Sequence, residues 1–452
     1  MKEKRVLVAG TGKSGIGAAK LLIETGHSVL LYDENRELDE NVLRAKLPAG
    51  ADVRICLGEL TKETAAEAAY CVISPGIPLE AAFVPVLEEA GVEIRSEIEL
   101  AYRQAKGRLA AITGTNGKTT TTALTGAILS SVYPETYMVG NIGIPYTEEA
   151  GKMSGEAVTA AEVSSFQLET IRDFHPEVSA ILNITPDHLN RHKTMENYIA
   201  VKESITKNQT EKDTCVLNYE DEELRRFGET LSVRVLYFSS KRTLEEGLFL
   251  RGGGIFIRED GAEEELCRTE ELKLVGVHNY ENVMAAAAVA LRMGVPLADI
   301  REACKNFRAV EHRIEYVTEE NGVVYYNDSK GTNPDAAIKG IEAMSRPTVL
   351  IGGGYDKQSE YREWLKACKS RVTALILIGE TAEKIAGEAK EVGLTEIVFA
   401  ADMEEAVAAA KAKARPGDAV LLSPACASWD MFESYEQRGR IFKDCVRRSK
   451  GV

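Results

Sequence analysis

Short runs of apolar residues alternate with longer stretches rich in Ala and Glu along almost the whole chain. Apolar runs of this length are typical of buried strands, and helical stretches between them are typical of mainly parallel sheets. The pattern therefore predicts an α/β protein. The predicted strands are 5–9, 28–32, 70–74, 109–112, 157–162, 178–184, 323–327, 348–351, 374–378, 396–400 and 419–422.

The chain has 452 residues, enough for three domains of about 150 residues each. The predicted strands fall into three groups, and we expect domains at 1–97, 98–309 and 310–452. The later part of the second group is less regular. It contains a predicted hairpin turn at 251–254 and closes with an Ala-rich helix at 281–293.

Composition excludes several classes of protein. The net charge of −15, without a basic stripe, argues against a nucleic-acid partner. The eight cysteines are scattered with no C-x-x-C pair, which favours reduced thiols over disulfides or a zinc site. Glycines and a lysine interrupt the first apolar run too early for a signal peptide, and no run approaches the ~20 residues of a membrane span. We expect a cytoplasmic protein with no membrane partner.

The stretch 109–122 carries the strongest chemical signal in the chain. It reads LAAITGTNGKTTTT, an apolar run, a loop with two glycines, a lysine and a hydroxyl at a helix start. Backbone N–H groups of such a loop hold phosphate, Lys118 can reach the outer phosphates, and Thr119 can ligate Mg²⁺. The longer P-loop pattern requires glycine at position 112, which is Ile112, so the loop is a shortened variant. The alternative is an ordinary helix start.

A second glycine-rich turn, 10–15, follows the first predicted strand, and Asp33 ends the next strand. The spacing fits a dinucleotide fingerprint, but the physics requires only a diphosphate at a helix N-terminus. NAD, another nucleotide diphosphate and a turn without a ligand all remain open on this evidence.

Ligands of open α/β sheets lie beyond the carboxyl ends of strands, where Thr119, Glu162 and His188 are predicted to lie. A carboxylate and a hydroxyl suit Mg²⁺, whereas a lone imidazole suits it less well. Glu162 could equally be a helix N-terminal charge, and His188 a partner of Asp187. Lys202 lies in a predicted helix, where nothing distinguishes it from a solvated lysine, and as a cation it should repel Mg²⁺.

Three loops of the third group are rich in small and polar residues, at 327–333, 352–357 and 423–430. Their lysines could hold an anionic substrate, although ordinary turn chemistry accounts for any one of them alone.

Taken together, these motifs resemble the Mur ligases of bacterial peptidoglycan synthesis over nearly the full chain. The shared stretches are Gly114–Thr119, Asn141-Ile-Gly, Glu162–Glu169, Asp187-His188, His278–Asn282, Glu311–Arg313, Asn327–Asn333 and Ser423–Ser428. The stretches SSFQLE and SPACAS point to the member that adds D-glutamate. The implied fold has a Rossmann-like N-terminal domain, a P-loop-type central ATPase domain and a Rossmann-like C-terminal domain.

The resemblance also implies roles for residues. The first domain would bind the UDP part of the substrate, rather than NAD, through Gly12, Ser14, Asp33, Ser74 and Asn141. ATP would contact Gly114, Thr115, Asn116, Gly117, Lys118, Thr119, Thr120, Asn282, Arg313 and Asp328. D-glutamate would contact Lys330, Thr332, Lys357, Ser428 and Tyr435.

Two Mg²⁺ ions are implied, one on Thr119 and Glu162 and one on His188 and Lys202. Carbamylation of Lys202 would turn a cation into an anionic oxygen ligand, which resolves the difficulty noted above. The implied catalytic residues are therefore Lys118, Glu162, His188 and Lys202. The enzyme would act as a monomer on small molecules, through an acyl phosphate and a tetrahedral intermediate. The residues leave open whether His188 or a substrate phosphate oxygen deprotonates the incoming amine.

Three alternatives are weighed against this interpretation. An NAD-dependent oxidoreductase would use the turn at 10–15 but would leave the loop of Lys118 unexplained. A nucleotide switch would be expected to carry an Asn-Lys-x-Asp guanine signature, and this chain has none. A ligase of the same chemistry could add a different amino acid.

Overall fold

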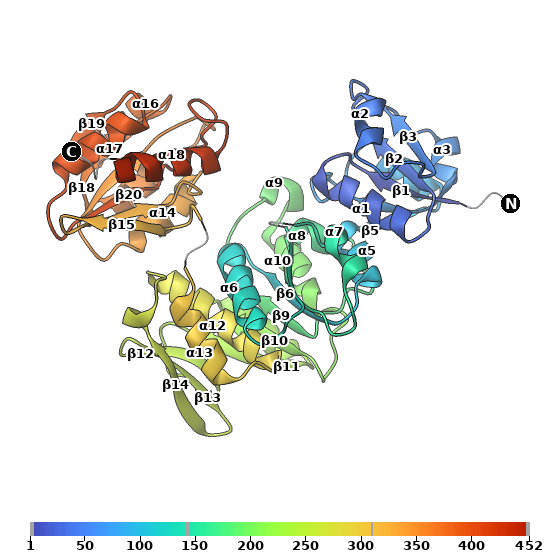
Figure 1. The fold of residues 1–452 in the computed structure, drawn as a ribbon, viewed down its shortest axis with the longest axis horizontal. Coiled ribbons are helices and arrows are strands. Elements are labelled where there is room, and N and C mark those ends of the chain that lie inside the picture. Colours follow the sequence, from blue (N-terminus) through green and yellow to red (C-terminus); the bar gives the residue numbers. More distant parts are fainter. Residues whose placement is uncertain (1–3, 142–143, 309–310, 449–452) are drawn as a thin grey trace. The chain divides into compact units, whose positions relative to one another are not determined.

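The computed structural model describes residues 4–141, 144–308 and 311–448, which form three mainly parallel sheets (Figure 1). The α/β class predicted from the apolar runs is therefore confirmed. None of the helices in these ranges is both long and apolar enough to cross a membrane.

The chain divides into two compact units, residues 1–267 with 281–304 and residues 268–280 with 305–452. The first unit contains the first two sheets, and the second contains the third sheet. The predicted boundary after residue 97 coincides with the start of a helix and stays a prediction. The predicted boundary at 309–310 lies outside the described residues.

The first sheet has the order β3-β2-β1-β4-β5, and every strand pair is parallel. Along β1, Val6 and Val8 enter one core cluster while Leu7 and Ala9 enter another. Burial on both faces explains why this strand is a continuous apolar run. The elements are β1 (Arg5–Ala9), α1 (Lys13–Glu24), β2 (Val29–Asp33), α2 (Glu40–Ala45), β3 (Val53–Leu57), α3 (Lys62–Ala66), β4 (Ala68–Ile73), α4 (Val84–Glu89), β5 (Glu93–Ser96) and α5 (Glu97–Gln104).

The second sheet has nine strands in the order β14-β13-β12-β11-β10-β9-β6-β8-β7. Its strands are β6 (Arg108–Thr113), β7 (Thr136–Gly140), β8 (Val158–Glu162), β9 (Val178–Ile181), β10 (Thr214–Asn218), β11 (Arg234–Ser239), β12 (Gly247–Arg251), β13 (Gly254–Glu259) and β14 (Ala262–Arg268). Its helices are α6 (Lys118–Ser130), α7 (Tyr146–Glu149), η1 (Ala150–Lys152), α8 (Ser165–Leu168), α9 (Leu189–His192), α10 (Met195–Glu203), η2 (Ser204–Thr206), α11 (Glu222–Thr230), η3 (Thr269–Glu271), α12 (Val277–Arg292) and α13 (Leu297–Asn306).

The predicted hairpin is confirmed, because β12 and β13 pair antiparallel and Arg251 faces Gly254. The Ala-rich helix begins at Val277, four residues before the predicted start. Strands β9, β6 and β8 are parallel neighbours, so their carboxyl ends meet at one edge of the sheet. Gly114 and His188 lie in the loops that follow β6 and β9, and Glu162 is the last residue of β8, so this topology positions the candidate site.

The third sheet has the order β15-β16-β20-β17-β18-β19, with β15 antiparallel to β16 and the other pairs parallel. Along β17, Leu350 enters the core cluster that contains α14 to α16, whereas Val349 and Ile351 enter the cluster that contains α17 and α18 (Figure 1). Helices therefore cover both faces. The elements are β15 (Glu315–Glu320), β16 (Val323–Asn327), α14 (Pro334–Glu342), β17 (Thr348–Gly352), α15 (Arg362–Cys368), β18 (Val372–Leu377), α16 (Ala382–Glu391), β19 (Ile397–Phe399), α17 (Met403–Lys413), β20 (Ala419–Leu422) and α18 (Tyr435–Arg448).

Candidate active site

The loop between β6 and α6 has the form of a phosphate cradle. Gly117 caps the helix in the left-handed region with φ of 88°, and α6 begins at Lys118. The Lys118 ammonium turns back over the loop and donates to the carbonyl oxygens of Gly114 and Thr115, both at 2.8 Å. Strand, loop, lysine and helix N-terminus therefore have the arrangement expected from the sequence, with Thr119 and Thr120 buried in the first turn.

Two asparagines hold this loop in place. The Asn183 side chain accepts from the backbone N–H of Asn116 at 2.8 Å and donates to its carbonyl at 3.0 Å. Asn282 lies on the other side, where its Oδ1 accepts from the Thr121 hydroxyl at 3.2 Å. The structure thus brings the predicted ATP residue Asn282 to the loop, and it adds Asn183, which no spacing in the sequence indicated.

Glu162, at the end of β8, is almost completely buried, with 1% exposure. Its Oε1 accepts from Asn141 Nδ2 at 2.9 Å, while its Oε2 is buried with no hydrogen-bond partner. A buried carboxylate oxygen that lacks a donor is costly, and a bound cation would satisfy it. Asn141, predicted to touch the nucleotide substrate, contacts Glu162 in this structure.

Lys202, on α10, is also buried, with 1% exposure, and its ammonium nitrogen donates to the Gly114 carbonyl at 2.8 Å. It lies 4.8 Å from the centre of the Tyr198 ring. Burial, with a further contribution from nearby Lys118, lowers the pKa of Lys202 well below its usual value. The structure therefore contradicts the solvated-lysine alternative, because the side chain is buried and burial disfavours its charged form.

His188 precedes α9 with a left-handed backbone, φ 53°. Its Nε2 lies 3.5 Å from Asp187 Oδ2, and its ring packs edge-on against Phe166 at 4.9 Å. About half of the side chain is exposed. The predicted residues thus divide into buried Glu162 and Lys202 with partly buried Lys118, and a histidine at the surface of the same strand ends.

A cavity of about 550 Å³ lies at the carboxyl ends of the first sheet. Four predicted residues line it, namely Gly12, Ser14, Asp33 and Ser74. Asp33 Oδ2 accepts from the Thr11 backbone N–H at 3.1 Å and from its hydroxyl at 2.6 Å, which fixes the glycine-rich turn.

In the second unit, Asp328 follows β16 and is buried. Its oxygens accept from the Ser423 hydroxyl at 2.7 Å and from the Ile314 N–H at 3.2 Å. Burial raises the pKa of Asp328 to about 7, an effect that Ser423 and Arg313 partly offset. Arg313 has a buried Nε with no hydrogen-bond partner, and its charge acts on Asp328, so a donor and a carboxylate of the predicted ATP set lie near each other.

Arg438, on α18, joins the two loops that carry most of the predicted D-glutamate residues. Its fully buried guanidinium donates to Ser329 Oγ and O at 3.0 and 2.9 Å, and to the carbonyls of Cys426 and Ala427 at 3.1 and 3.0 Å. Arginine at this position of the sequence carried no distinguishing signal, because its burial depends in part on the loop of Ser329, 109 residues upstream.

The predicted D-glutamate residues include two lysines beside aromatic rings. Lys330 Nζ lies 5.7 Å from the ring centre of Tyr435, and Lys357 Nζ lies 5.2 Å from that of Trp429. Ser428 is buried and Thr332 is half-buried on the same loops. Lys330 follows β16 and Lys357 follows β17, the two strands that flank β20, and two such cations suit a dicarboxylate ligand.

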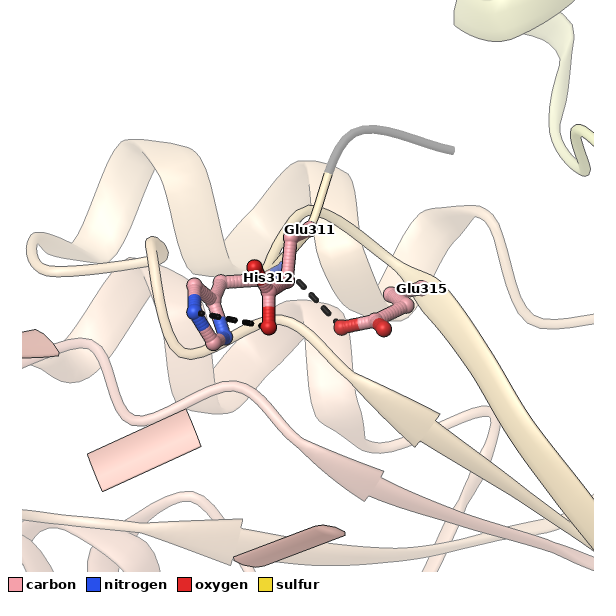
Figure 2. A group of neighbouring side chains, drawn as sticks. All are labelled: Glu311, His312 and Glu315. Atoms are coloured by element: carbon pink, nitrogen blue, oxygen red, sulfur yellow. Dashed lines mark hydrogen bonds and ion pairs between the residues drawn. The ribbon is translucent and has the colours of Figure 1, made fainter. Parts of the chain in front are cut away.

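Glu311, His312 and Glu315 form a separate group whose nitrogen and oxygen atoms lie within 4.8 Å of one another (Figure 2). A cation from the chain already bridges the two carboxylates, because Lys443 Nζ donates to Glu311 Oε1 at 2.6 Å and to Glu315 Oε1 at 2.9 Å.

The hydrogen bonds of Asn327 decide the state of the His312 ring. Ser329 N–H donates to Asn327 Oδ1, so Asn327 Nδ2 is the atom that donates to His312 Nδ1, at 2.9 Å. Burial lowers the pKa of His312, and in the neutral ring, with Nδ1 accepting from Asn327, the proton lies on Nε2, 3.6 Å from Glu311 Oε1. With no ring lone pair directed at the carboxylates, the group is an ion-pair network and not a metal site.

Family sequence profiles match three parts of the chain. They are described as Mur ligase MurD-like, N-terminal domain (residues 4–96), Mur ligase middle domain (112–290) and Mur ligase, glutamate ligase domain (312–426). A phosphate loop in a parallel α/β domain between two further α/β domains is the architecture of this class of enzyme. The chain belongs to the Mur ligase family.

Curated relatives match over the whole length. A protein of Lachnoclostridium phytofermentans named UDP-N-acetylmuramoylalanine--D-glutamate ligase is 53% identical over 447 residues, 99% of this chain and 98% of the relative. One of the same name from Clostridioides difficile is 45% identical over 454 residues and covers both chains completely. The family membership decides for a ligase and against the oxidoreductase and switch alternatives.

Solved structures show the same fold. The UDP-N-acetylmuramate-alanine ligase of Thermotoga maritima aligns with a TM-score of 0.60 and 19% identity, covering 98% of this chain and 99% of that one. The MurF ligase of the same organism, solved in complex with ADP, aligns with a TM-score of 0.59 and 18% identity, covering 99% and 97%. The three-domain Mur ligase fold predicted from the motifs is thus confirmed.

Proposed function

We propose that this ligase joins D-glutamate to the L-alanyl carboxylate of UDP-N-acetylmuramoyl-L-alanine, with ATP as phosphate donor, in the synthesis of peptidoglycan precursors. The group formed by partly buried Lys118 and buried Glu162 and Lys202 at the phosphate loop carries the proposal. The names of relatives up to 53% identical support the choice of amino acid.

The first step is phosphoryl transfer. The alanyl carboxylate attacks the γ-phosphorus of ATP, the bond to the bridging oxygen breaks, and an acyl phosphate and ADP form. Catalysis of such a step requires positioning and neutralisation of phosphate charge. The Lys118 ammonium, which lies over the loop, would supply charge to the phosphate oxygens, and the N–H groups of the loop would supply further donors.

The second step is amide formation. The neutral amine of D-glutamate attacks the acyl carbon, a tetrahedral oxyanion forms, and inorganic phosphate leaves. Cationic groups are needed both to bind the two carboxylates of D-glutamate and to stabilise the oxyanion. Lys330 and Lys357, held beside aromatic rings, are the residues we assign to the amino acid, together with Thr332, Ser428 and Tyr435.

Mg²⁺ fits the residues that are present. Glu162 has a buried oxygen without a donor, and Thr119 offers a hydroxyl in the first turn of α6. A neutral Lys202 amine can add CO₂ with loss of a proton, which gives a carbamate whose oxygens could ligate a second ion with His188. Bound Mg²⁺ would supply neutralisation of phosphate charge.

The cavity of the first domain suits the UDP part of the substrate, because a glycine-rich turn and the N-terminus of α1 face it. We also infer a cytoplasmic location, consistent with eight cysteines that all have free thiols. A monomer remains our expectation.

The test is release of phosphate from ATP in the presence of UDP-N-acetylmuramoyl-L-alanine and one amino acid at a time. D-glutamate should stimulate release, whereas L-glutamate, L-alanine and meso-diaminopimelate should not. A preference for another amino acid would keep the chemistry and change the substrate. Phosphate release that no amino acid stimulates would contradict the proposal.

A further inference from the structure

Arg191, on α9, bonds to a loop more than 100 positions earlier in the chain. Its Nη1 donates to the Pro75 carbonyl at 2.6 Å, and its Nη2 donates to the Ile77 carbonyl at 3.1 Å. Both residues line the cavity of the first domain. The guanidinium therefore ties one wall of that cavity to the segment that begins with His188.

The other donors of Arg191 are engaged by Glu169. Nε donates to Oε1 at 3.1 Å and Nη2 to Oε2 at 2.5 Å, and both side chains are only 11% exposed. A two-point bond of this kind holds the guanidinium plane in a fixed orientation. The two carbonyl bonds thus come from an arginine that is already fixed within the central domain.

Arg191 also stacks on the ring against which His188 packs. The Arg191 Cζ lies 4.0 Å from the centre of the Phe166 ring, and the same ring meets His188 edge-on at 4.9 Å. Phe166 and Glu169 both belong to the SSFQLE stretch that follows Glu162. One short segment therefore fixes Arg191, and Arg191 in turn contacts the first domain.

We propose that Arg191 is a positioning residue that holds the loop Ser74–Ile77 in its substrate-binding arrangement and aligns it with the segment of His188. This inference rests on the proposed function, because it assigns the cavity to the nucleotide substrate. It predicts that Arg191 sets the affinity for that substrate and leaves the affinity for ATP unchanged.

Two variants test the role. Arg191→Ala removes both carbonyl bonds, and because one charge-assisted bond accounts for about a tenfold change in an equilibrium constant, KM for the nucleotide substrate should rise about tenfold or more. Arg191→Lys keeps the charge but cannot span two carbonyls and a carboxylate, so it should be impaired nearly as much. KM for ATP should stay within about twofold in both variants.

Lys193→Ala is the matched control. Lys193 lies in the same segment and also faces the first domain, at 3.6 Å from Glu80, but both side chains are more than half exposed. Because exposed pairs contribute little, this variant should keep KM for the nucleotide substrate within about twofold.

Two further measurements do not depend on turnover. Hydrogen exchange of the 74–79 segment should be faster in both Arg191 variants than in the unmodified protein, and titration with UDP alone should show weaker binding. Unchanged exchange together with an unchanged nucleotide KM or UDP affinity would overturn the role of Arg191. If the unmodified enzyme showed no D-glutamate-dependent turnover, the proposed function would fail, and these measurements would still decide the role of Arg191.

Discussion

Replacement of Gly117 by alanine tests the phosphate loop with a single added methyl group. Gly117 has φ of 88°, and a side chain there costs about 1–2 kcal/mol. The added Cβ would lie 2.3 Å from Asn282 Oδ1, so that amide must move. The Thr121 hydroxyl would then lose its acceptor, a further cost of about 0.5–1.5 kcal/mol.

These costs sum to about 1.5–3.5 kcal/mol against the loop conformation that binds phosphate, or about 10- to 400-fold in affinity. We expect Gly117→Ala to lower kcat/KM for ATP by this factor, with KM for D-glutamate nearly unchanged. ADP binding measured by titration calorimetry should fall in parallel. The measurement therefore separates nucleotide binding from chemistry.

Gly26→Ala is the matched control, because Gly26 has φ of 85° with no atom within 4 Å of the added Cβ. It should lower the thermal midpoint and leave kcat/KM for ATP unchanged. In an Asn282→Ala background the clash disappears, so Gly117→Ala should cost less there than in the unmodified enzyme. If the Gly117→Ala single variant bound ATP within about twofold of the unmodified enzyme, the reasoning would be refuted.

The remaining predictions concern ionisable groups. Lys202→Ala should abolish turnover, and added bicarbonate should not restore it; near-normal turnover at saturating Mg²⁺ would exclude a carbamate role. Glu162→Gln keeps the acceptor for Asn141 but removes the charge, so kcat should fall by about 100-fold or more with little change in thermal midpoint. Asp328 has a raised pKa of about 7 in the folded state, so it favours folding below pH 4 and loses this contribution as the pH rises to 7. The thermal midpoint of Asp328→Asn should therefore rise relative to that of the unmodified enzyme as the pH increases from 4 to 7. A difference between the two midpoints that does not change with pH would contradict the raised pKa of Asp328.

Much of the fold could be predicted because its central strands are buried on both faces. The predicted strands 5–9, 323–327 and 419–422 coincide with β1, β16 and β20. Such strands are continuous apolar runs, which the sequence displays directly. The strand β15, with the sequence EYVTEE, was not predicted, because an edge strand that is largely exposed lacks that pattern.

The candidate site could be predicted as far as its motifs are local. The loop Gly114–Thr119, the turn at 10–15 and the strand-end position of Glu162 follow from the order of residues in one short segment each. The bond between Arg191 and the loop at 75–77 could not be predicted, since the partners are backbone carbonyls and any sequence provides those.

The sequence by itself determined the α/β class, the positions of the two glycine-rich turns and the family resemblance. Only the tertiary structure decided the burial of Lys202, which nothing in the local sequence distinguished from a solvated lysine. Its nitrogen bonds to a carbonyl 88 positions away, and burial there removes the water that would stabilise its charge. The same holds for Arg438 and Asp328, because the solvation of a charge depends on residues that only the folded chain brings together.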